Sequence, residues 1–397
     1  MSFLEKIFIL FLFIFPTGVI ARLQFSNGVA LSLNDFALVV LVGSWLIGKI
    51  KSRNIRKDYL LFTPLAAFLL IGFFSLLLNF LNLGMGRFLI SFSYLLRLLG
   101  YCLLYFVVSD FSNKFKEKIS KYMIFSGFIV ILVGYLQYFF FPSLKSIFYL
   151  GWDEHLYRMV SVFLDPNFAG AFFNIYFIFL LDFLRKRYKK MSFSKSFILG
   201  LMSILTLFSI YLTYSRSALI MLFVSLTVYL YLIGKRRMIF VSMIFLVFLI
   251  FISPRAFQTE GTNLLRTVSS GERISSLGVA IKIIKDNPVL GVGFDAYRYA
   301  QNKIGLNNIY WQTTHSGAGT DASLIFVIAT TGFIGFSFFL YLIYKMLYLA
   351  NKNLNKNGII LFSILLGLIA DSFFVNSLFF VFILEWVWII CGITENS

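Results

Sequence analysis

Charged residues are scarce in this chain. They make up 13% of its 397 residues, whereas hydrophobic residues make up 59% and phenylalanine alone contributes 51. In soluble domains about a quarter of the residues are charged. A soluble core could not hide this much apolar surface, so lipid must be the solvent for most of it. The composition therefore excludes an ordinary soluble protein and predicts an all-α polytopic membrane protein.

Cysteine, histidine and the common cofactor motifs are also rare or absent. The two cysteines, Cys102 and Cys391, lie in apolar runs and form no CxxC pair. We therefore predict neither a disulfide framework nor a cysteine metal site. The sequence contains two histidines, and it has no P-loop, no Rossmann glycine fingerprint and no cluster of metal ligands. We expect neither a metal nor a cofactor.

Acidic residues are half as frequent as basic ones. The chain has 17 Asp and Glu against 35 Lys and Arg, which gives a formal net charge of +18. In a soluble protein this excess would suggest a nucleic-acid partner. Here the basic residues lie mostly in short loops between apolar runs, where they fix the orientation of a membrane protein. Loops rich in Lys and Arg alternate along the chain with loops that contain few. This alternation predicts an even number of crossings, with the N- and C-termini in the cytoplasm. Because the charge is explained in this way, we expect no nucleic-acid partner.

Twelve apolar runs are candidates for membrane helices, each of which needs about 20 mostly apolar residues. The first run is interpreted as a helix and not as a signal peptide, because no cleavage site of small residues follows it cleanly. The expected spans are residues 5–20, 35–49, 60–79, 88–109, 122–141, 166–184, 196–213, 217–233, 238–253, 321–343, 358–375 and 377–391. We expect the shortest of them to be tilted or broken.

One long polar segment interrupts the pattern of short loops. Residues 254–320 separate nine expected helices in residues 1–253 from three in residues 321–397. We expect this segment on the outer face, and loops of this length in a compact protein are usually functional. Its run ERISSLGVAIKIIK, residues 272–285, has apolar residues at helical spacing. This spacing predicts a short amphipathic helix on the membrane surface.

Three arginines stand out because of their surroundings. Arg216, in TYSRSALI between two expected helices, either snorkels to the interface or holds a phosphate, whose oxygens its planar guanidinium binds in pairs. Arg273 opens the amphipathic run, where its ordinary role is that of a solvated loop charge. Arg97 lies inside an expected helix, where an arginine is costly. It either has a functional role or pairs with an acid such as Asp371.

Three further side chains stand at or near expected helix starts. In LDPNFAGAFF, Asp165 and Pro166 are ordinary helix-start residues, and Asn167 then points into the first turn. Asp321 precedes another expected helix, where it is a cap or a reactive group, and its carboxylate suits the positive end of a helix. His315, in WQTTHSGAG, is either a loop histidine or a proton acceptor whose pKa suits neutral pH.

Taken in order, these segments resemble the bacterial O-antigen ligase and polymerase superfamily, whose members are integral-membrane glycosyltransferases acting on polyprenyl-pyrophosphate-linked glycans. DPNFAGA is similar to the family's NPN-type segment, and YSRSALI to its Ser-Arg-Gly/Ser segment. SGERISSLGVAIKIIKDNPVLGVGFDAY is similar to its Arg…Pro-Leu-Leu-Gly-Val-Gly loop, and TDASLIFVIATTGFIG to its helix that ends in Gly-x-x-Gly. The resemblance covers about residues 160–340. It implies a GT-C-like helical architecture in the bacterial cytoplasmic membrane, with an extracytoplasmic active site.

The resemblance also implies roles for single residues. Arg216 and Arg273 would bind the substrate pyrophosphate, and no metal would be needed. Asp321 or His315 would take the proton of the acceptor hydroxyl or orient the acceptor. The glycines of Gly-x-x-Gly would let their helix pack closely against a neighbour. Further residues expected to contact the substrate are Asn167, Arg97 and Tyr214.

One departure from the family pattern bears on the reaction. Ligases of the family tend to place a histidine eleven residues before the first glycine of Gly-x-x-Gly, which is Gly332 here. That position is Asp321, and His315 lies six residues earlier. We therefore expect a polymerase for O-antigen (lipopolysaccharide), capsule or exopolysaccharide, which transfers an undecaprenyl-pyrophosphate-linked oligosaccharide onto a second lipid-linked unit. A chain-length regulator is a further candidate partner. The alternatives are a ligase that moves the finished chain to lipid A-core or protein, and a transporter or flippase for lipid-linked sugars.

Overall fold

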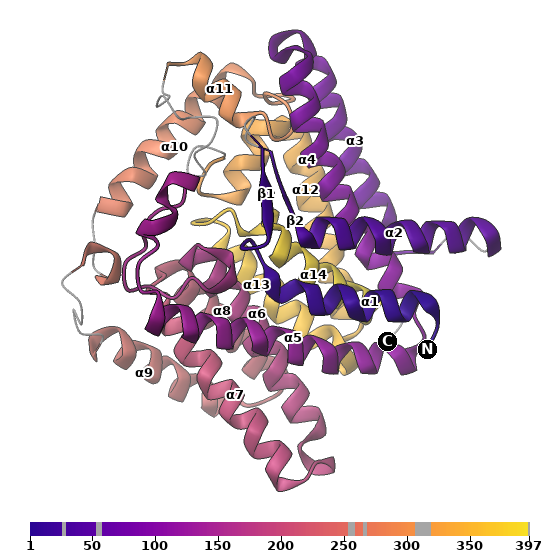
Figure 1. Ribbon diagram of the computed structural model, residues 1–397, viewed down its shortest axis with the longest axis vertical. Helices are drawn as coiled ribbons and strands as arrows, with labels where there is room; N and C mark the ends of the chain where they lie inside the picture. Colours follow the sequence, from indigo (N-terminus) through magenta and orange to yellow (C-terminus); the bar gives the residue numbers. More distant parts are fainter. Residues whose placement is uncertain (26–28, 53–57, 253–258, 265–267, 306–318, 396–397) are drawn as a thin grey trace.

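The protein is built almost entirely from helices. The computed structural model describes residues 1–25, 29–52, 58–252, 259–264, 268–305 and 319–395. These residues form fourteen α-helices and one antiparallel two-stranded sheet (Figure 1). The helices are α1 (Phe3–Ile14), α2 (Leu33–Ser52), α3 (Phe62–Leu78), α4 (Phe80–Ser109), α5 (Asn113–Phe140), α6 (Pro166–Arg187), α7 (Phe193–Leu212), α8 (Arg216–Leu232), α9 (Arg236–Ile252), α10 (Val268–Asp286), α11 (Tyr297–Lys303), α12 (Ser323–Lys352), α13 (Ile359–Asp371) and α14 (Val381–Thr394). The strands are β1 (Arg22–Gln24) and β2 (Ala30–Ser32).

A helix occupies each of the twelve segments in which the sequence predicts one. Seven helical segments are long and apolar enough to cross a membrane, namely α2, α4, α5, α6, α7, α12, and α13 together with the turn before it. The prediction of an all-α, multi-pass membrane protein is therefore confirmed. The helices α1, α3, α8, α9 and α14 are shorter, with 12 to 17 residues each. Because a full crossing needs about 20 residues, the number of twelve crossings stays a prediction.

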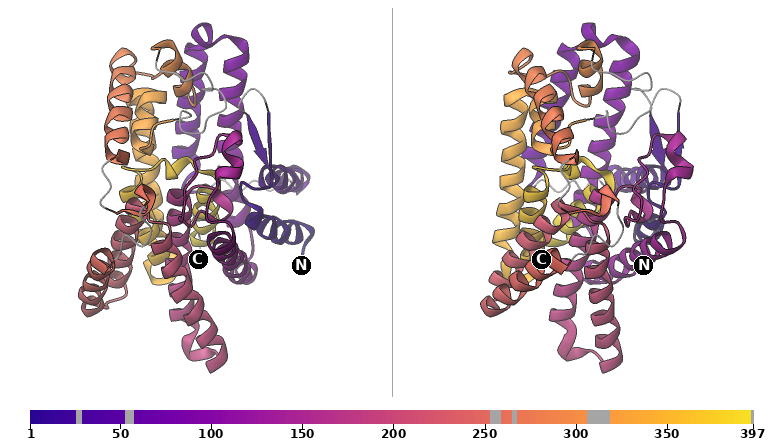
Figure 2. Two further views of the ribbon diagram at one scale, coloured as in Figure 1. Left: turned by 60° about the vertical axis from the view of Figure 1, so that its left-hand side comes forward. Right: turned by 90° about the vertical axis from the view of Figure 1, so that its left-hand side faces the viewer.

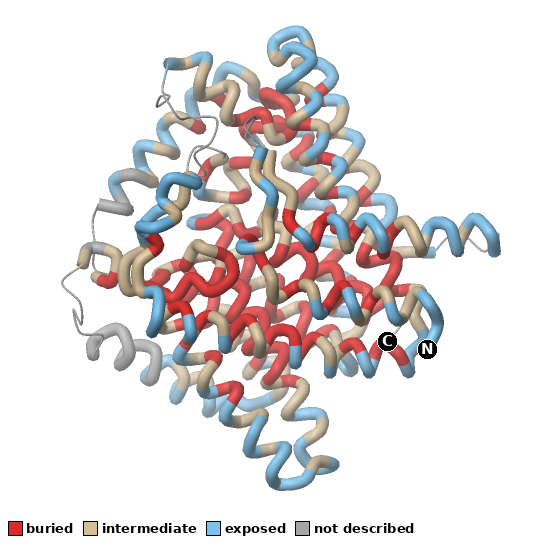
Figure 3. The backbone as a smooth tube through the Cα atoms, viewed as in Figure 1, coloured by how far each residue is buried: buried red, intermediate tan, exposed pale blue. Residues whose placement is uncertain are grey.

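The buried core lies around α6 and α14 (Figure 3). Every residue of α14 from Phe382 to Thr394 is buried. Small residues let the central helices approach one another, as is usual between membrane helices. A Cβ added to Gly170 of α6 would lie 2.5 Å from the Cβ of Ala218 in α8. One added to Gly367 of α13 would lie 2.8 Å from the Cβ of Ser225, also in α8. The helices α6 and α13 therefore both pack directly on α8.

The helix α12 is interrupted at Gly332, where φ is 65° and ψ is −173°. The loop between α10 and α11 packs against this break. The Gly293 N–H donates a hydrogen bond to the Thr330 carbonyl at 3.0 Å, and the Phe333 N–H donates to the Pro288 carbonyl at 2.9 Å. The expectation that Gly332 serves contact between helices is thus wrong, because this glycine admits a loop.

The second glycine of the motif does serve helix packing. A Cβ added to Gly335 would overlap the Thr331 side chain one turn earlier in α12 and would lie 3.3 Å from Cγ2 of Ile71 in α3, along which α12 packs. The two glycines of one Gly-x-x-Gly motif therefore have different tasks. The first fixes the long polar segment onto α12, and the second fixes α12 onto the bundle.

The helix α10 lies alongside α12 (Figure 2), and α11 also contacts α12. Ala280 and Ile283 of α10 are buried together with Phe326 and Ala329 of α12. The helix α10 covers the run for which the sequence predicts a short amphipathic helix. Because α10 also carries Arg273, its packing on α12 decides where that cation lies.

Replacing Gly332 by alanine is expected to lower the stability by about 3 kcal/mol. This backbone conformation, which essentially only glycine adopts, costs about 1–3 kcal/mol once a Cβ is present, and this Cβ would overlap the Val289 carbonyl, which adds about 1–3 kcal/mol of overpacking. Gly84→Ala is the matched control, because Gly84 interrupts α4 with a φ of 72° but has open space around its missing Cβ. The apparent Tm of the detergent-solubilised protein measures both variants. Equal losses would contradict the role of the loop contact.

Candidate active site

The start of α6 is fixed by its own sequence. Asp165 is the N-cap, and its Oδ1 accepts hydrogen bonds from the N–H groups of Asn167 at 2.7 Å and Phe168 at 3.1 Å. Pro166 occupies the first helical position, where its fixed φ suits the helix and its missing N–H costs nothing. The predicted helix start at the DPN motif is therefore confirmed. Asn167, half-buried, is left to interact with a neighbouring element.

That neighbour is the start of α8. Ser215 is the N-cap of α8, and its hydroxyl donates a hydrogen bond to Oδ1 of Asn167 at 2.8 Å. Arg216 is the first residue of the helix and is half-buried. The close contact between Gly170 and Ala218 one turn further along keeps the two helix starts together. The DPN and YSRS motifs are thus one structural unit.

Two helix N-termini therefore meet at this unit. Each leaves backbone N–H groups without partners in its own helix and carries a partial positive charge. Arg216, the first residue of α8, adds a cation to these two helix starts, and helix N-termini are sites of the kind that binds phosphate. Only three residues connect the end of α7 to the start of α8, so the position of Arg216 is closely tied to the end of α7.

The turn before α8 is braced by Arg158, a residue that the sequence analysis did not single out. Arg158 is buried, and its Nε donates a hydrogen bond to the Thr213 carbonyl at 2.9 Å. The turn needs support because the next residue, Tyr214, has a φ of 48°, which is unfavourable for a residue with a Cβ. Arg158 lies in a segment without a recognisable motif, so only the three-dimensional contact reveals its role.

Asp321 and Arg273 belong to one electrostatic group with two further carboxylates. Arg273 is half-buried on the second turn of α10, and Asp321 is exposed just before α12. Loss of hydration is the main cause that raises the pKa of Asp321, while the Arg273 cation lowers it and the Asp165 carboxylate raises it further. Arg273 and Asp165 also act electrostatically on Asp371, at the end of α13. Charged groups from α6, α10, α12 and α13 therefore converge.

Asp371 is the least expected member of this group. It is fully buried, and neither carboxylate oxygen accepts a hydrogen bond within the described part of the chain. The hydroxyls of Ser217 and Ser377 lie near it, and Ser217 directly follows Arg216. A buried carboxylate is costly unless hydrogen-bond donors reach it, and among the described residues these two hydroxyls are the side-chain donors nearby. Asp371 is therefore suited to accept a hydrogen bond from a bound molecule, and its only signal in the sequence is an acid at the end of an apolar run.

The other two expected substrate contacts differ in position: Tyr214 directly precedes Ser215 at the candidate site, whereas Arg97 lies within α4. Tyr214 is buried, and burial raises the pKa of its hydroxyl, with further contributions from Tyr138 and Tyr211. Arg97 donates hydrogen bonds from Nε and Nη2 to the two carboxylate oxygens of Asp35, both at 2.7 Å. The acid that pairs with Arg97 is thus Asp35 and not Asp371.

Of the two histidines, only His155 lies within the described residues. His315 lies outside the described residues. His155, which the sequence analysis did not consider, has its Nε2 at 3.7 Å from Oδ2 of Asp165. This contact places an imidazole beside the N-cap of α6. No motif surrounds His155, so the sequence gives no signal for it.

The arrangement can perform two chemical tasks. Its cations and helix starts can stabilise an anionic phosphate, and its carboxylates can accept a proton. No group of three or more His, Cys, Asp or Glu side chains that could hold a metal ion occurs among the residues that the structure describes.

Comparison with known protein families gives one match, which covers part of the chain. A family model described as O-antigen ligase matches residues 201–340, a range that contains Arg216, Arg273 and Asp321. Members of this family are glycosyltransferase-like enzymes. A search of curated proteins finds no matching relative. The match supports the resemblance to the O-antigen ligase and polymerase superfamily that the sequence motifs indicate.

Proposed function

We propose that this protein is a polysaccharide polymerase of the bacterial cytoplasmic membrane. It transfers a glycan from a polyprenyl-pyrophosphate carrier, such as undecaprenyl pyrophosphate, to a sugar hydroxyl on a second carrier-linked repeat unit. The observation that carries this proposal is the meeting of the α6 and α8 N-termini at Arg216. A leaving pyrophosphate needs such a concentration of positive charge.

In this reaction the hydroxyl oxygen of the acceptor attacks the anomeric carbon of the donor. The bond between that carbon and the pyrophosphate oxygen breaks, and the carrier pyrophosphate leaves with the bonding electrons. Arg216 and Arg273 stabilise the charge on the leaving group. Asp321 takes the proton of the attacking hydroxyl, and a raised pKa makes a carboxylate a better base near neutral pH. His315 is the other candidate for this proton.

The proposed topology puts the N- and C-termini in the cytoplasm and the active site at the outer face. The distribution of Lys and Arg supports this orientation. With twelve crossings, the described residues 259–264 and 268–305, which include α10 with Arg273, lie on the same outer side as the site. The asparagine of the DPN motif, Asn167, would contact the substrate beside Arg216.

A ligase is the second candidate, because the matching family model is described as O-antigen ligase. The position of Asp321 eleven residues before Gly332 favours the polymerase, since ligases of the family tend to carry a histidine there. A transporter of lipid-linked sugars is the third candidate.

The deciding experiment follows carrier-linked glycans in cells that lack the gene and in cells that regain it. Loss of a polymerase leaves single repeat units on the carrier at the outer face, and the ladder of longer chains returns with the gene. Loss of a ligase leaves long chains on the carrier. Loss of a transporter leaves single units at the cytoplasmic face. Either of the last two results would overturn the proposal.

Asp321→Asn is expected to lower chain growth by about 10²–10⁴-fold, the usual contribution of a general base. In the wild type, activity should fall as the pH drops through the pKa of Asp321, because the protonated carboxyl cannot accept a proton. Since partial loss of hydration raises this pKa, the acid limb lies above the range of an ordinary aspartate. Arg273→Gln removes a cation that lowers the pKa of Asp321, so the limb should move to higher pH.

The measurement is the initial rate of polymerisation by membranes across a series of pH values. Asp153→Asn, a change at an exposed acid, is the control and should leave the profile unchanged. If the residual activity of Asp321→Asn kept the wild-type acid limb, another group such as His315 would be the proton acceptor.

A further inference from the structure

A second polar region lies at the far end of α6. This helix has 22 residues and is therefore about 33 Å long, with Asn167 at one end and Lys186 at the other. At the Lys186 end, a cavity of about 1020 Å³ opens between helices. Its lining comes from the first turns of α5, α7 and α13 and the last turns of α6 and α14. The cavity is thus separate from the candidate active site.

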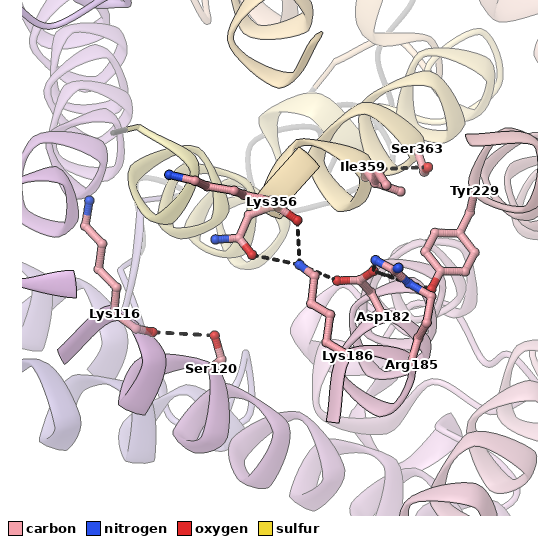
Figure 4. A network of polar contacts seen from close by, with 10 residues as sticks. Lys116, Ser120, Asp182, Arg185, Lys186, Tyr229, Lys356, Ile359 and Ser363 are labelled. Carbon is pink, nitrogen blue, oxygen red and sulfur yellow. Dashed lines mark hydrogen bonds and ion pairs between the residues drawn. The ribbon is translucent and has the colours of Figure 1, made fainter. Parts of the chain in front are cut away.

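The cavity is strongly basic. Seven of its lining side chains are Lys or Arg, and two are acidic. One of the two acids, Asp182, is already used, because its buried carboxylate forms ion pairs with Arg185 and with Lys186 Nζ, the latter at 2.7 Å (Figure 4). Lys186 also donates hydrogen bonds to the Lys356 carbonyl and to Asn357. This network occupies one wall of the cavity and neutralises part of its charge.

Three lysines of the lining are not neutralised in this way. Lys121 of α5, Lys190 after α6 and Lys195 of α7 are exposed. Within the described residues they form no ion pair. Three ammonium groups on one cavity repel one another unless an anion lies between them. The electrostatics therefore favour a negatively charged occupant.

The remaining wall of the cavity is apolar. Its deep lining consists of aliphatic and aromatic side chains, among them Ile124, Phe179, Leu199, Ile360, Ile390 and Ile393. Four of the contributing segments, α5, α6, α7 and α13 with the turn before it, are long and apolar enough to cross the membrane. Their ends lie at the depth of the lipid headgroups. The cavity thus offers cations at headgroup depth and an apolar wall beside them.

We propose that this cavity binds an anionic phospholipid. The lipid phosphate lies among Lys121, Lys190 and Lys195, and an acyl chain follows the apolar wall. A free phosphate ion would leave that wall empty, and a zwitterionic lipid would bring its own cation to the lysines. Basic pockets between membrane helices are known to bind anionic headgroups on the cytoplasmic side, which is the side that the proposed topology gives this cavity. The inference itself does not depend on the proposed glycan transfer.

The test uses the full-length protein in detergent, titrated with phosphatidylglycerol while the apparent Tm is followed. Replacing Lys121, Lys190 and Lys195 together by glutamine should weaken the binding about 100-fold, because each lysine contributes about fivefold. The expected control result is unchanged binding in a second triple variant with the same loss of charge. Its three positions are exposed residues on the same segments that do not line the cavity, namely Lys114, Lys118 and Lys189.

Two further titrations distinguish the sources of the phosphate. Phosphatidylcholine tests whether the charge of the headgroup matters, and inorganic phosphate tests whether the acyl chain matters. At equal concentrations of the three compounds, we expect only phosphatidylglycerol to raise the apparent Tm. It is overturned if phosphatidylcholine or inorganic phosphate stabilises the protein equally well. It is also overturned if the two triple variants lose binding to the same extent.

Discussion

Arg216→Ala is expected to lower polymer formation per protein molecule by at least about 100-fold, the effect of removing one fixed donor from an anionic transition state. Arg216 is the first residue of α8, beside the N-cap serine that donates a hydrogen bond to Asn167. Arg216 thus belongs to the pair of helix N-termini at which α6 and α8 begin side by side. The leaving pyrophosphate would lose its fixed cation, and carrier-linked glycans should stop at a single repeat unit.

The assay compares the ladder of carrier-linked glycans with the amount of protein in the membrane. Arg216→Lys should give an intermediate loss, because an ammonium group keeps the charge but cannot bind two phosphate oxygens with a planar fork. Arg236→Ala is a matched control, because Arg236 is also the first residue of a helix, α9, and is exposed. A full ladder in Arg216→Ala would show that this arginine is an interfacial anchor only.

The starts of α6 and α8 were predictable because neighbouring residues fix them. Asp165 supplies an N-cap oxygen to the next turn, and Pro166 presets the backbone of the first helical residue. Both effects act within a few residues, so the sequence carries them directly. The order of the motifs was enough to indicate the superfamily, which the match to residues 201–340 supports.

The end of α13 and the start of α14 were less predictable, because hydrogen bonds to a residue distant in the sequence fix the turn between them. The expected spans 358–375 and 377–391 are interrupted after Asp371. The Ser372 carbonyl accepts a hydrogen bond from the Ser323 N–H at 2.9 Å, and the Leu378 N–H donates to the Ser323 hydroxyl at 3.2 Å. The turn thus serves the start of α12, and apolar composition alone gives no sign of it.

The environment of the candidate site could not be predicted for the same reason. The Gly-x-x-Gly spacing at Gly332 suits either a helix contact or a helix break, and only the inserted loop decides between them. The approach of Ser217 to Asp371 joins residues more than 150 positions apart. No local rule connects such residues. Their placement depends on the packing of α13 on α8, which small residues permit but do not specify.

Asp35→Asn is expected to lower the stability by about 3–5 kcal/mol, the usual cost of leaving one member of a buried ion pair alone. Both oxygens of Asp35 are hydrogen-bonded to Arg97, and Oδ1 also accepts a hydrogen bond from the Tyr101 hydroxyl at 3.0 Å. Arg97 lies within α4, one of the segments able to cross the membrane, so its charge cannot easily reach water. The apparent Tm and the yield of folded protein measure the loss. Asp153→Asn, at an exposed acid, should cost less than about 0.5 kcal/mol.

The double variant Asp35→Asn/Arg97→Gln separates the two roles proposed for Arg97. Removing both charges leaves no unpaired ion, so the double variant should be more stable than Asp35→Asn alone. Because two of the guanidinium nitrogens are engaged by Asp35, we expect the pair to be structural and the double variant to regain the glycan ladder. A double variant that folds and reaches the membrane but makes only single repeat units would contradict this. Arg97 would then be a substrate ligand that Asp35 holds in position.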